Sequence, residues 1–135
     1  MSQHVLDANI HELHCQALRR RFSMVKVGDE FGYSSMSDED IRRELRNSKQ
    51  TFHTQDRRFC HPRHRHPTYC LVFYDVERKD FVSCVQRFLR HPQFNTRNKR
   101  MGLVVRVTLE HIEVWELHRE NREIVEWHSL SAYRG

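Results

Sequence analysis

A continuous run of apolar residues, YCLVFYDV at residues 69–76, is the feature that most restricts how this chain folds. Aromatic and β-branched side chains pack well on a pleated sheet, so the run predicts a buried β-strand. It follows a segment that Pro62 and Pro67 exclude from helical structure, because proline lacks the amide hydrogen that a helix needs. The middle of the chain is therefore predicted to contribute a strand to a sheet.

The last third of the chain is also predicted to be β-structure. Apolar residues alternate with more polar ones over residues 102–109, which is typical of a strand with one buried face. Residues 111–118 and 122–130 predict two further strands, joined by a turn at residues 119–122. We expect these strands to form an antiparallel meander.

Three helices are predicted from apolar residues at helical spacing. The first covers residues 5–22, and the second covers residues 37–48, where the Ser37 hydroxyl can cap the first turn. Acidic residues begin this second helix and arginines end it, as the helix dipole favours. The third covers residues 80–91 and stops at Pro92.

The predicted fold class is α+β: two N-terminal helices, a buried strand, a third helix and a C-terminal antiparallel β-meander. At 135 residues the chain has the size of one domain, residues 1–135. Within it we expect a helical part at 1–48, a basic His/Arg-rich loop at 49–68, and a sheet with one helix at 69–135. Residues 93–100 predict a further polar loop.

The sequence also indicates the cellular compartment in which the protein is expected. No stretch approaches the roughly twenty apolar residues of a membrane span, so no membrane association is expected. The N-terminus lacks the basic start and apolar centre of a signal peptide. Four cysteines without such a signal indicate a reducing compartment, so a cytoplasmic location is expected.

Charge is distributed unevenly along the chain. Residues 1–48 carry a net charge of −1, residues 49–106 carry +9, and residues 107–135 carry −3. Nineteen of the 23 basic residues are arginine, whose planar guanidinium binds phosphate or carboxylate with two hydrogen bonds. A basic middle of this kind favours a polyanion as the partner, with an acidic protein as the alternative.

The segment CHPRHRHPTYC at residues 60–70 has two interpretations. It offers zinc ligand types, and the candidate metal residues are Cys60, His64, His66 and Cys70. Structural zinc sites usually place a dozen or more residues between two ligand pairs, whereas these pairs are almost adjacent, and four arginines lie nearby. No resident cofactor is therefore expected, although zinc or Mg²⁺ would suit some of the side chains.

The alternative is contact with nucleic acid. Guanidinium groups bind phosphate, and histidine and aromatic rings can stack on unpaired bases. A second basic cluster near residue 100 is expected on the same side. The predicted nucleic-acid-binding residues are Arg57, Arg58, His61, Arg63, His64, Arg65, His66, Tyr69, Arg97, Lys99 and Arg100.

Two catalytic alternatives remain open. In the first, Glu77 and Lys79 form an E-x-K motif at the end of the buried strand, with Asp56 about twenty residues upstream. Asp75 and Glu77, two residues apart on one face of the strand, are an alternative carboxylate pair. Two carboxylates holding Mg²⁺ and a lysine that positions water suit phosphodiester hydrolysis. With a helix and then a strand after the E-x-K motif, this order resembles the core of the PD-(D/E)xK nucleases, and the resemblance implies a Mg²⁺-dependent nuclease.

The second catalytic alternative is a metal-independent ribonuclease. It would use histidines as general acid and base, and arginines to stabilise the phosphorane-like transition state. The candidates are His53, His61, His64 and His66. His11 and His14, in the segment HELHC, are spaced three rather than four apart and are expected on an exposed helix face.

The sequence thus predicts a small basic intracellular protein that binds nucleic acid, RNA ahead of DNA, through its Arg/His-rich centre. A small nuclease of either catalytic type is one alternative. A non-enzymatic interaction or inhibitor module, which binds an acidic protein, is the other. The oligomeric state is not indicated by any of these patterns.

Overall fold

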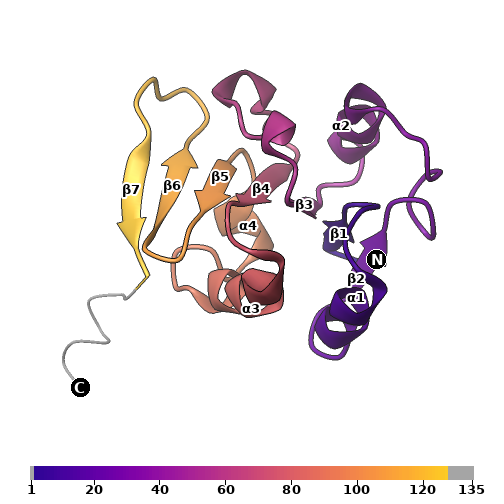
Figure 1. Ribbon diagram of the computed structural model, residues 1–135. Coiled ribbons are helices and arrows are strands. Elements are labelled where there is room, and N and C mark those ends of the chain that lie inside the picture. The colour runs from indigo at the N-terminus through magenta and orange to yellow at the C-terminus, as the bar shows by residue number, and fades with distance from the viewer. Residues whose placement is uncertain (1, 128–135) are drawn as a thin grey trace.

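A computed structural model describes residues 2–127, which form a seven-stranded sheet flanked by helices (Figure 1). The strands are β1 (His4–Leu6), β2 (Met24–Lys26), β3 (Thr51–Thr54), β4 (Cys70–Tyr74), β5 (Val104–Val107), β6 (His111–Trp115) and β7 (Glu123–Glu126). The α-helices are α1 (Glu12–Arg19), α2 (Asp38–Arg46), α3 (Phe81–Arg90) and α4 (Arg97–Arg100). Three 3₁₀ turns are η1 (Arg57–Phe59), η2 (Pro62–His64) and η3 (Arg78–Asp80).

The sheet is mostly parallel, which corrects the predicted architecture. Its strand order is β2-β1-β3-β4-β5-β6-β7, and every pairing from β2 to β5 is parallel. Only the pairs β5–β6 and β6–β7 are antiparallel. The coarse expectation of mixed α and β structure is confirmed, but the helical part at residues 1–48 contains two strands. Part of the strand predicted at residues 122–130 lies outside the described residues.

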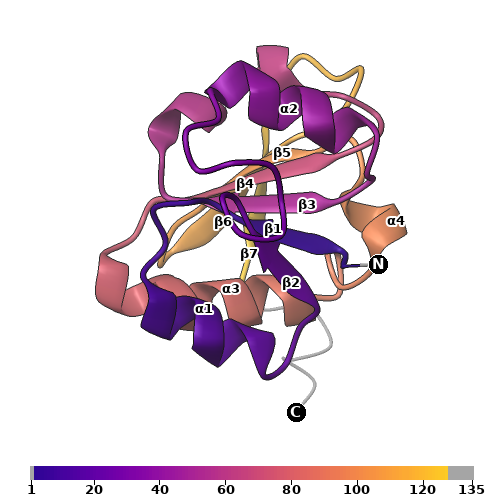
Figure 2. The same cartoon turned by 90° about the vertical axis from the view of Figure 1, so that its right-hand side faces the viewer.

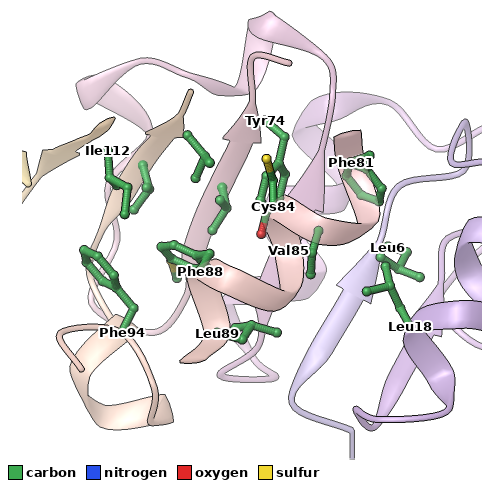
Figure 3. Close-up of a cluster of buried hydrophobic side chains, with 14 of the residues drawn as sticks. Leu6, Leu18, Tyr74, Phe81, Cys84, Val85, Phe88, Leu89, Phe94 and Ile112 are labelled. Carbon is green, nitrogen blue, oxygen red and sulfur yellow. The ribbon is translucent and has the colours of Figure 1, made fainter. Parts of the chain in front are cut away.

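The helices cover both faces of the sheet (Figure 2). Helices α1 and α3 lie against one face, and α2 lies against the other. Beneath α1 and α3, aromatic and aliphatic side chains from β4, β5 and β6 pack with Phe81, Val85 and Phe88 (Figure 3). A smaller cluster under α2 joins Ile41 and Leu45 to Phe52 and other residues of the opposite face. Strand β4 is buried along its whole length, as predicted.

Local signals explain where the helices begin. The Ser37 hydroxyl accepts a hydrogen bond from the Asp40 amide at 3.1 Å, so the predicted cap of α2 is confirmed. The first helix is shorter than predicted and begins at Glu12, because residues 4–6 instead form β1. Residues 97–100, predicted as loop, form the short helix α4, whose cap is the hydroxyl of Thr96.

The order of the first strands creates a topological switch point. From β1 the chain passes through α1 to β2 on one side, and then through α2 to β3 on the other side. The carboxyl ends of β1 and β3 are therefore adjacent, while the connections that leave them diverge to opposite faces. In open parallel sheets, ligands bind in the crevice formed at such a point. None of the helices in residues 2–127 has the length and apolar character to cross a membrane.

Candidate active site

A cavity of about 360 Å³ lies at the switch point, where the chain leaves β1 and β3. It is lined by Asp7, Asn9, Ile10, His11, His14, Gln55, Asp56, Arg57 and Arg78. Two carboxylates, two arginines and two histidines thus share one polar cavity. This composition suits a charged ligand better than an apolar one.

Asp7 is the most buried polar residue of this cavity, with 8% of its surface exposed. It directly follows β1, where its amide donates to the carbonyl of His53 in the neighbouring strand. Its carboxylate accepts a hydrogen bond from the Thr54 hydroxyl at 2.6 Å and another from the Ala8 amide at 2.7 Å. Burial raises the pKa of Asp7, and the charges of Asp56 and Asp38 raise it further. A cation beside this carboxylate would favour its charged form and so offset both causes of the raised pKa.

Thr54 links the carboxylate of Asp7 to the backbone amide of Asp56. While its hydroxyl donates to Asp7, the same oxygen accepts a hydrogen bond from the Asp56 amide at 2.9 Å. Because Thr54 ends β3, the sheet itself sets the spacing between these two acidic residues. Asp38, the first residue of α2, contributes a third negative charge to the same region.

Arg58 is the cation that these carboxylates hold in the structure. Its guanidinium donates to both oxygens of Asp56, the shorter bond from Nη2 being 2.8 Å, and its Nε lies 3.5 Å from Asp38. This hydrogen bonding holds the pKa of Asp56 below its ordinary value. The Arg58 side chain is 75% exposed, so it can leave without disturbing the core.

Arg57 and Arg78 contribute positive charge to the lining of the cavity. Arg57 is 75% exposed, lies 3.6 Å from Asp75 and stacks over the Phe73 ring at 5.6 Å. Arg78 begins η3, which follows β4. His11, the exposed N-cap residue of α1, and the half-buried His14 also line this cavity.

The carboxylates suit a hard divalent cation that keeps much of its water. Among residues 2–127, no three His, Cys, Asp or Glu side chains converge as a complete metal site. Mg²⁺ does not need one, because it is commonly bound by one or two carboxylates together with water and substrate phosphate. Asp7 and Asp56 are two such carboxylates. They would not suffice for a structural zinc ion, which is held by four protein ligands.

The predicted zinc ligands do not come together. Cys70 is fully buried in β4 and packs in the cluster beneath α1 and α3, and burial raises the pKa of its thiol to about 12. Burial also raises the pKa of the Cys60 thiol, to about 11. His64 lies in η2 and His66 stacks on Tyr69. The zinc interpretation of residues 60–70 therefore gains no support from the described geometry.

The other catalytic candidates do not line this cavity. Glu77 and Lys79 are 3.8 Å apart and more than three-quarters exposed, and Glu77 lines a different cavity from Asp56. Asp75 is paired with Arg106. His53 has no exposed surface and lies in a buried chain with His4 and Tyr74, so no external substrate can reach it.

The predicted nucleic-acid-binding residues divide into two groups, which corrects the expectation of one surface. Arg57 and Arg58 lie at the carboxyl edge of the sheet, beside the cavity at the switch point. Arg97, Lys99 and Arg100 lie at the opposite edge, where Arg100 bonds to Thr51 at the beginning of β3. The two groups flank different ends of the strands.

Some of these predicted binding residues have structural roles instead. Tyr69 is 2% exposed and donates its hydroxyl hydrogen to the His64 carbonyl, so its ring is not free to stack on a base. Arg65 donates to the carbonyls of Pro62, Glu116 and Arg119, and thereby fastens the 60–68 segment to the end of β6. His61 and Arg63 remain exposed.

Sequence reasoning missed Asp7, Asp38 and Arg78 as site residues. The sequence predicts Asp38 only as an acidic residue in the first turn of the second helix, and it places Asp7 inside the predicted first helix. The missed signal was the short apolar segment HVL directly before Asp7. A polar residue that follows a buried parallel strand lies at the edge where such sheets bind ligands.

Comparison with known proteins identifies no relatives. No protein-family model matches the chain, and neither the curated proteins nor the solved structures give a significant match. The chemistry of the cavity is therefore inferred from its own side chains.

Proposed function

We propose that the protein is a Mg²⁺-dependent nuclease whose active site is the cavity at the carboxyl ends of β1 and β3. The observation that carries the proposal is the presence of two carboxylates, the buried Asp7 and Asp56, in the lining of one cavity. The Thr54 hydroxyl fixes their placement, because it donates to the Asp7 carboxylate and accepts from the backbone amide of Asp56. Arginines line the same cavity. Carboxylates for a hard cation, placed beside cations for a phosphate, are the combination that phosphodiester hydrolysis requires.

In this proposal the acidic residues bind the metal ion and the basic residues bind the phosphate. Asp7 and Asp56 would hold the ion, with Asp38 adding negative charge nearby. Bound Mg²⁺ supplies an activated water and neutralises charge on the phosphate. Arg57 and Arg78 would bind the phosphate oxygens, since guanidinium groups offer paired donors to them.

Nucleic acid is the preferred phosphodiester because of the basic surface beside the cavity. Arg58, Arg63 and Arg42 lie on or near η1, η2 and α2, the elements that border the switch point on one face. Such charges bind a phosphate backbone without reading its bases. The assay therefore includes RNA and DNA, each single- and double-stranded, with RNA expected ahead of DNA.

The test is cleavage of end-labelled oligonucleotides with Mg²⁺ and with EDTA. We expect cleavage only with Mg²⁺, and a loss of at least about a hundredfold for Asp7→Asn and for Asp56→Asn, which remove ion ligands. Asp29→Asn is the matched control, because it removes the same charge from an exposed position that does not line the cavity.

The outcomes discriminate between the alternatives. Cleavage in EDTA, or full activity of Asp7→Asn, would refute the proposed site. Activity lost with Glu77→Gln and retained with Asp7→Asn would restore the E-x-K interpretation. Salt-sensitive binding of oligonucleotides without any cleavage would reduce the function to nucleic-acid binding alone.

A further inference from the structure

A second cavity lies at the amino edge of the sheet, on the far side of the molecule from the candidate active site. Its volume is about 270 Å³, and its polar lining consists of Gln3, His4, Arg21, Ser23, Asn95 and Arg100. Among residues 2–127, no carboxylate lines it. Figure 2 shows the N-terminal end of β1 close to α4, and the hydrogen bond from Arg100 to Gln3 joins the two.

Arg100 places a positive charge beside this cavity, and the residue is almost fully shielded from solvent, with 2% of its surface exposed. Its guanidinium donates to the Thr51 hydroxyl at 2.9 Å, the Phe94 carbonyl at 2.8 Å and the Gln3 side-chain carbonyl at 3.1 Å. All three acceptors are neutral, and within residues 2–127 Arg100 forms no ion pair. A guanidinium has five N–H groups, so two remain for another acceptor.

Arg97 increases this excess of positive charge. It lies one turn before Arg100 in α4, and its Nε is buried without a hydrogen-bond partner among the described residues. Burial lowers the pKa of Arg100, and the charge of Arg97 lowers it further. Buried cations are usually paired with an anion, because an uncompensated charge out of water is costly.

His4 is oriented so that it also presents a donor. Tyr74 lies 2.7 Å from Nδ1 of His53, and Nε2 of His53 lies 3.0 Å from Nδ1 of His4. If the buried Tyr74 hydroxyl donates, His53 must donate onward to His4, which leaves the His4 proton on Nε2. If His53 instead donated from Nδ1 to the Tyr74 oxygen, the hydroxyl hydrogen of Tyr74 would have no acceptor. His4, which lines the cavity, thus has a single donor, the Nε2–H of a neutral imidazole, in addition to the donors of the arginines.

We propose that this cavity is a binding site for a phosphate group, held by Arg100 and Arg21 with His4 and Asn95 as neutral donors. Arginine forks match the paired oxygens of phosphate. The side-chain carbonyl of Asn95 is already occupied by Lys99, so its amide hydrogens are the part left to donate. The volume is below that of pockets for drug-sized ligands, which favours a single phosphate group over a larger molecule.

The test is binding of inorganic phosphate, measured by calorimetry and by the thermal midpoint in a phosphate- and sulfate-free buffer. Chloride at matched ionic strength is the reference, and a nucleoside 5′-monophosphate is a second ligand. We expect saturable stabilisation by phosphate that chloride does not reproduce. A nucleoside monophosphate that binds more tightly would identify an esterified phosphate as the source, and tighter binding of inorganic phosphate would identify the free ion.

The variants distinguish phosphate binding in this cavity from a general effect of the protein's positive charge. Arg21→Gln should weaken phosphate binding about three- to tenfold, because it removes a charged donor at the exposed mouth. Arg20→Gln removes the same charge from the next residue, which does not line the cavity, and should leave the affinity unchanged. Arg100→Gln should abolish binding where it folds. Equal stabilisation by phosphate and chloride, or equal losses in Arg20→Gln and Arg21→Gln, would overturn the proposal.

Discussion

Acidification from pH 7 to pH 5 should lower the free energy of unfolding by about 2 kcal/mol through His4 alone. Burial, followed by the charges of Arg100 and Arg97, lowers the pKa of His4 from 6.5 to about 3. The unfolded chain takes up this proton near pH 6.5, whereas the folded chain does not until about pH 3. Stability is therefore complete above pH 6.5 and is lost as the pH falls through this window.

The magnitude follows from the shift itself. One pKa unit corresponds to about 1.36 kcal/mol, so the loss is about 2 kcal/mol at pH 5 and approaches about 5 kcal/mol near pH 3. The pKa of His53 is also lowered, by burial and then by His4, so it adds to the loss. Asp7 acts in the opposite direction, because its raised pKa makes protonation easier in the folded state.

The assay is urea unfolding at pH 7, 6 and 5, followed by tryptophan fluorescence. The variant is His4→Asn, whose side-chain oxygen can still accept the hydrogen bond from His53 but cannot be protonated. We expect it to lose about 2 kcal/mol less than the wild type between pH 7 and pH 5. His61→Asn is the control, because His61 is exposed and Asn can replace its capping contact with the Arg63 amide. An unchanged pH dependence in His4→Asn would refute the buried, neutral state of this imidazole.

Three further predictions follow from single contacts. Arg58→Gln should raise the affinity of the carboxylates for Mn²⁺ about threefold, measured by electron paramagnetic resonance, because the guanidinium that now occupies Asp56 is removed; lower affinity would contradict this. Phe88→Ala should lower the free energy of unfolding by about 3–5 kcal/mol in urea, since its ring is fully buried; a loss below about 1 kcal/mol would contradict the packing. Ser37→Ala should cost about 1 kcal/mol in the same assay by removing the cap of α2, whereas Ser37→Asp should not.

The elements that could be predicted are those whose signal is local. Strand β4 carries five consecutive buried side chains, and α2 has its cap and its terminal charges within the helix itself. Strands β1 and β2 are three residues each, too short to establish a period of two. Leu6 ends β1 and Ile10 follows the turn, yet their spacing of four imitates a helix. The prediction therefore extended the first helix through a strand and a turn.

The candidate site was harder to predict because its properties depend on partners distant in sequence. Asp7 is buried and bonded through Thr54, 47 residues away, which also holds the amide of Asp56. The local signal for Asp7 is only the three-residue segment HVL before it, which is too short to distinguish a strand from a helix. His53 looked like a catalytic candidate for the same reason, since its partners His4 and Tyr74 lie on neighbouring strands.

The charge pattern illustrates how a parallel sheet separates residues that the sequence groups together. The block at residues 49–106, with its net charge of +9, appeared to be one basic surface. In a parallel sheet, however, connections that leave strands lie at one edge and connections that enter them lie at the other. Arg57 and Arg58 follow β3 and therefore meet the carboxylates of the carboxyl edge. Arg97 and Arg100 precede β5 and therefore lie at the amino edge, where none of the described residues that line the adjacent cavity is acidic. Strand direction, more than position along the chain, thus decides which cations have a carboxylate partner and which still have donors for an anion.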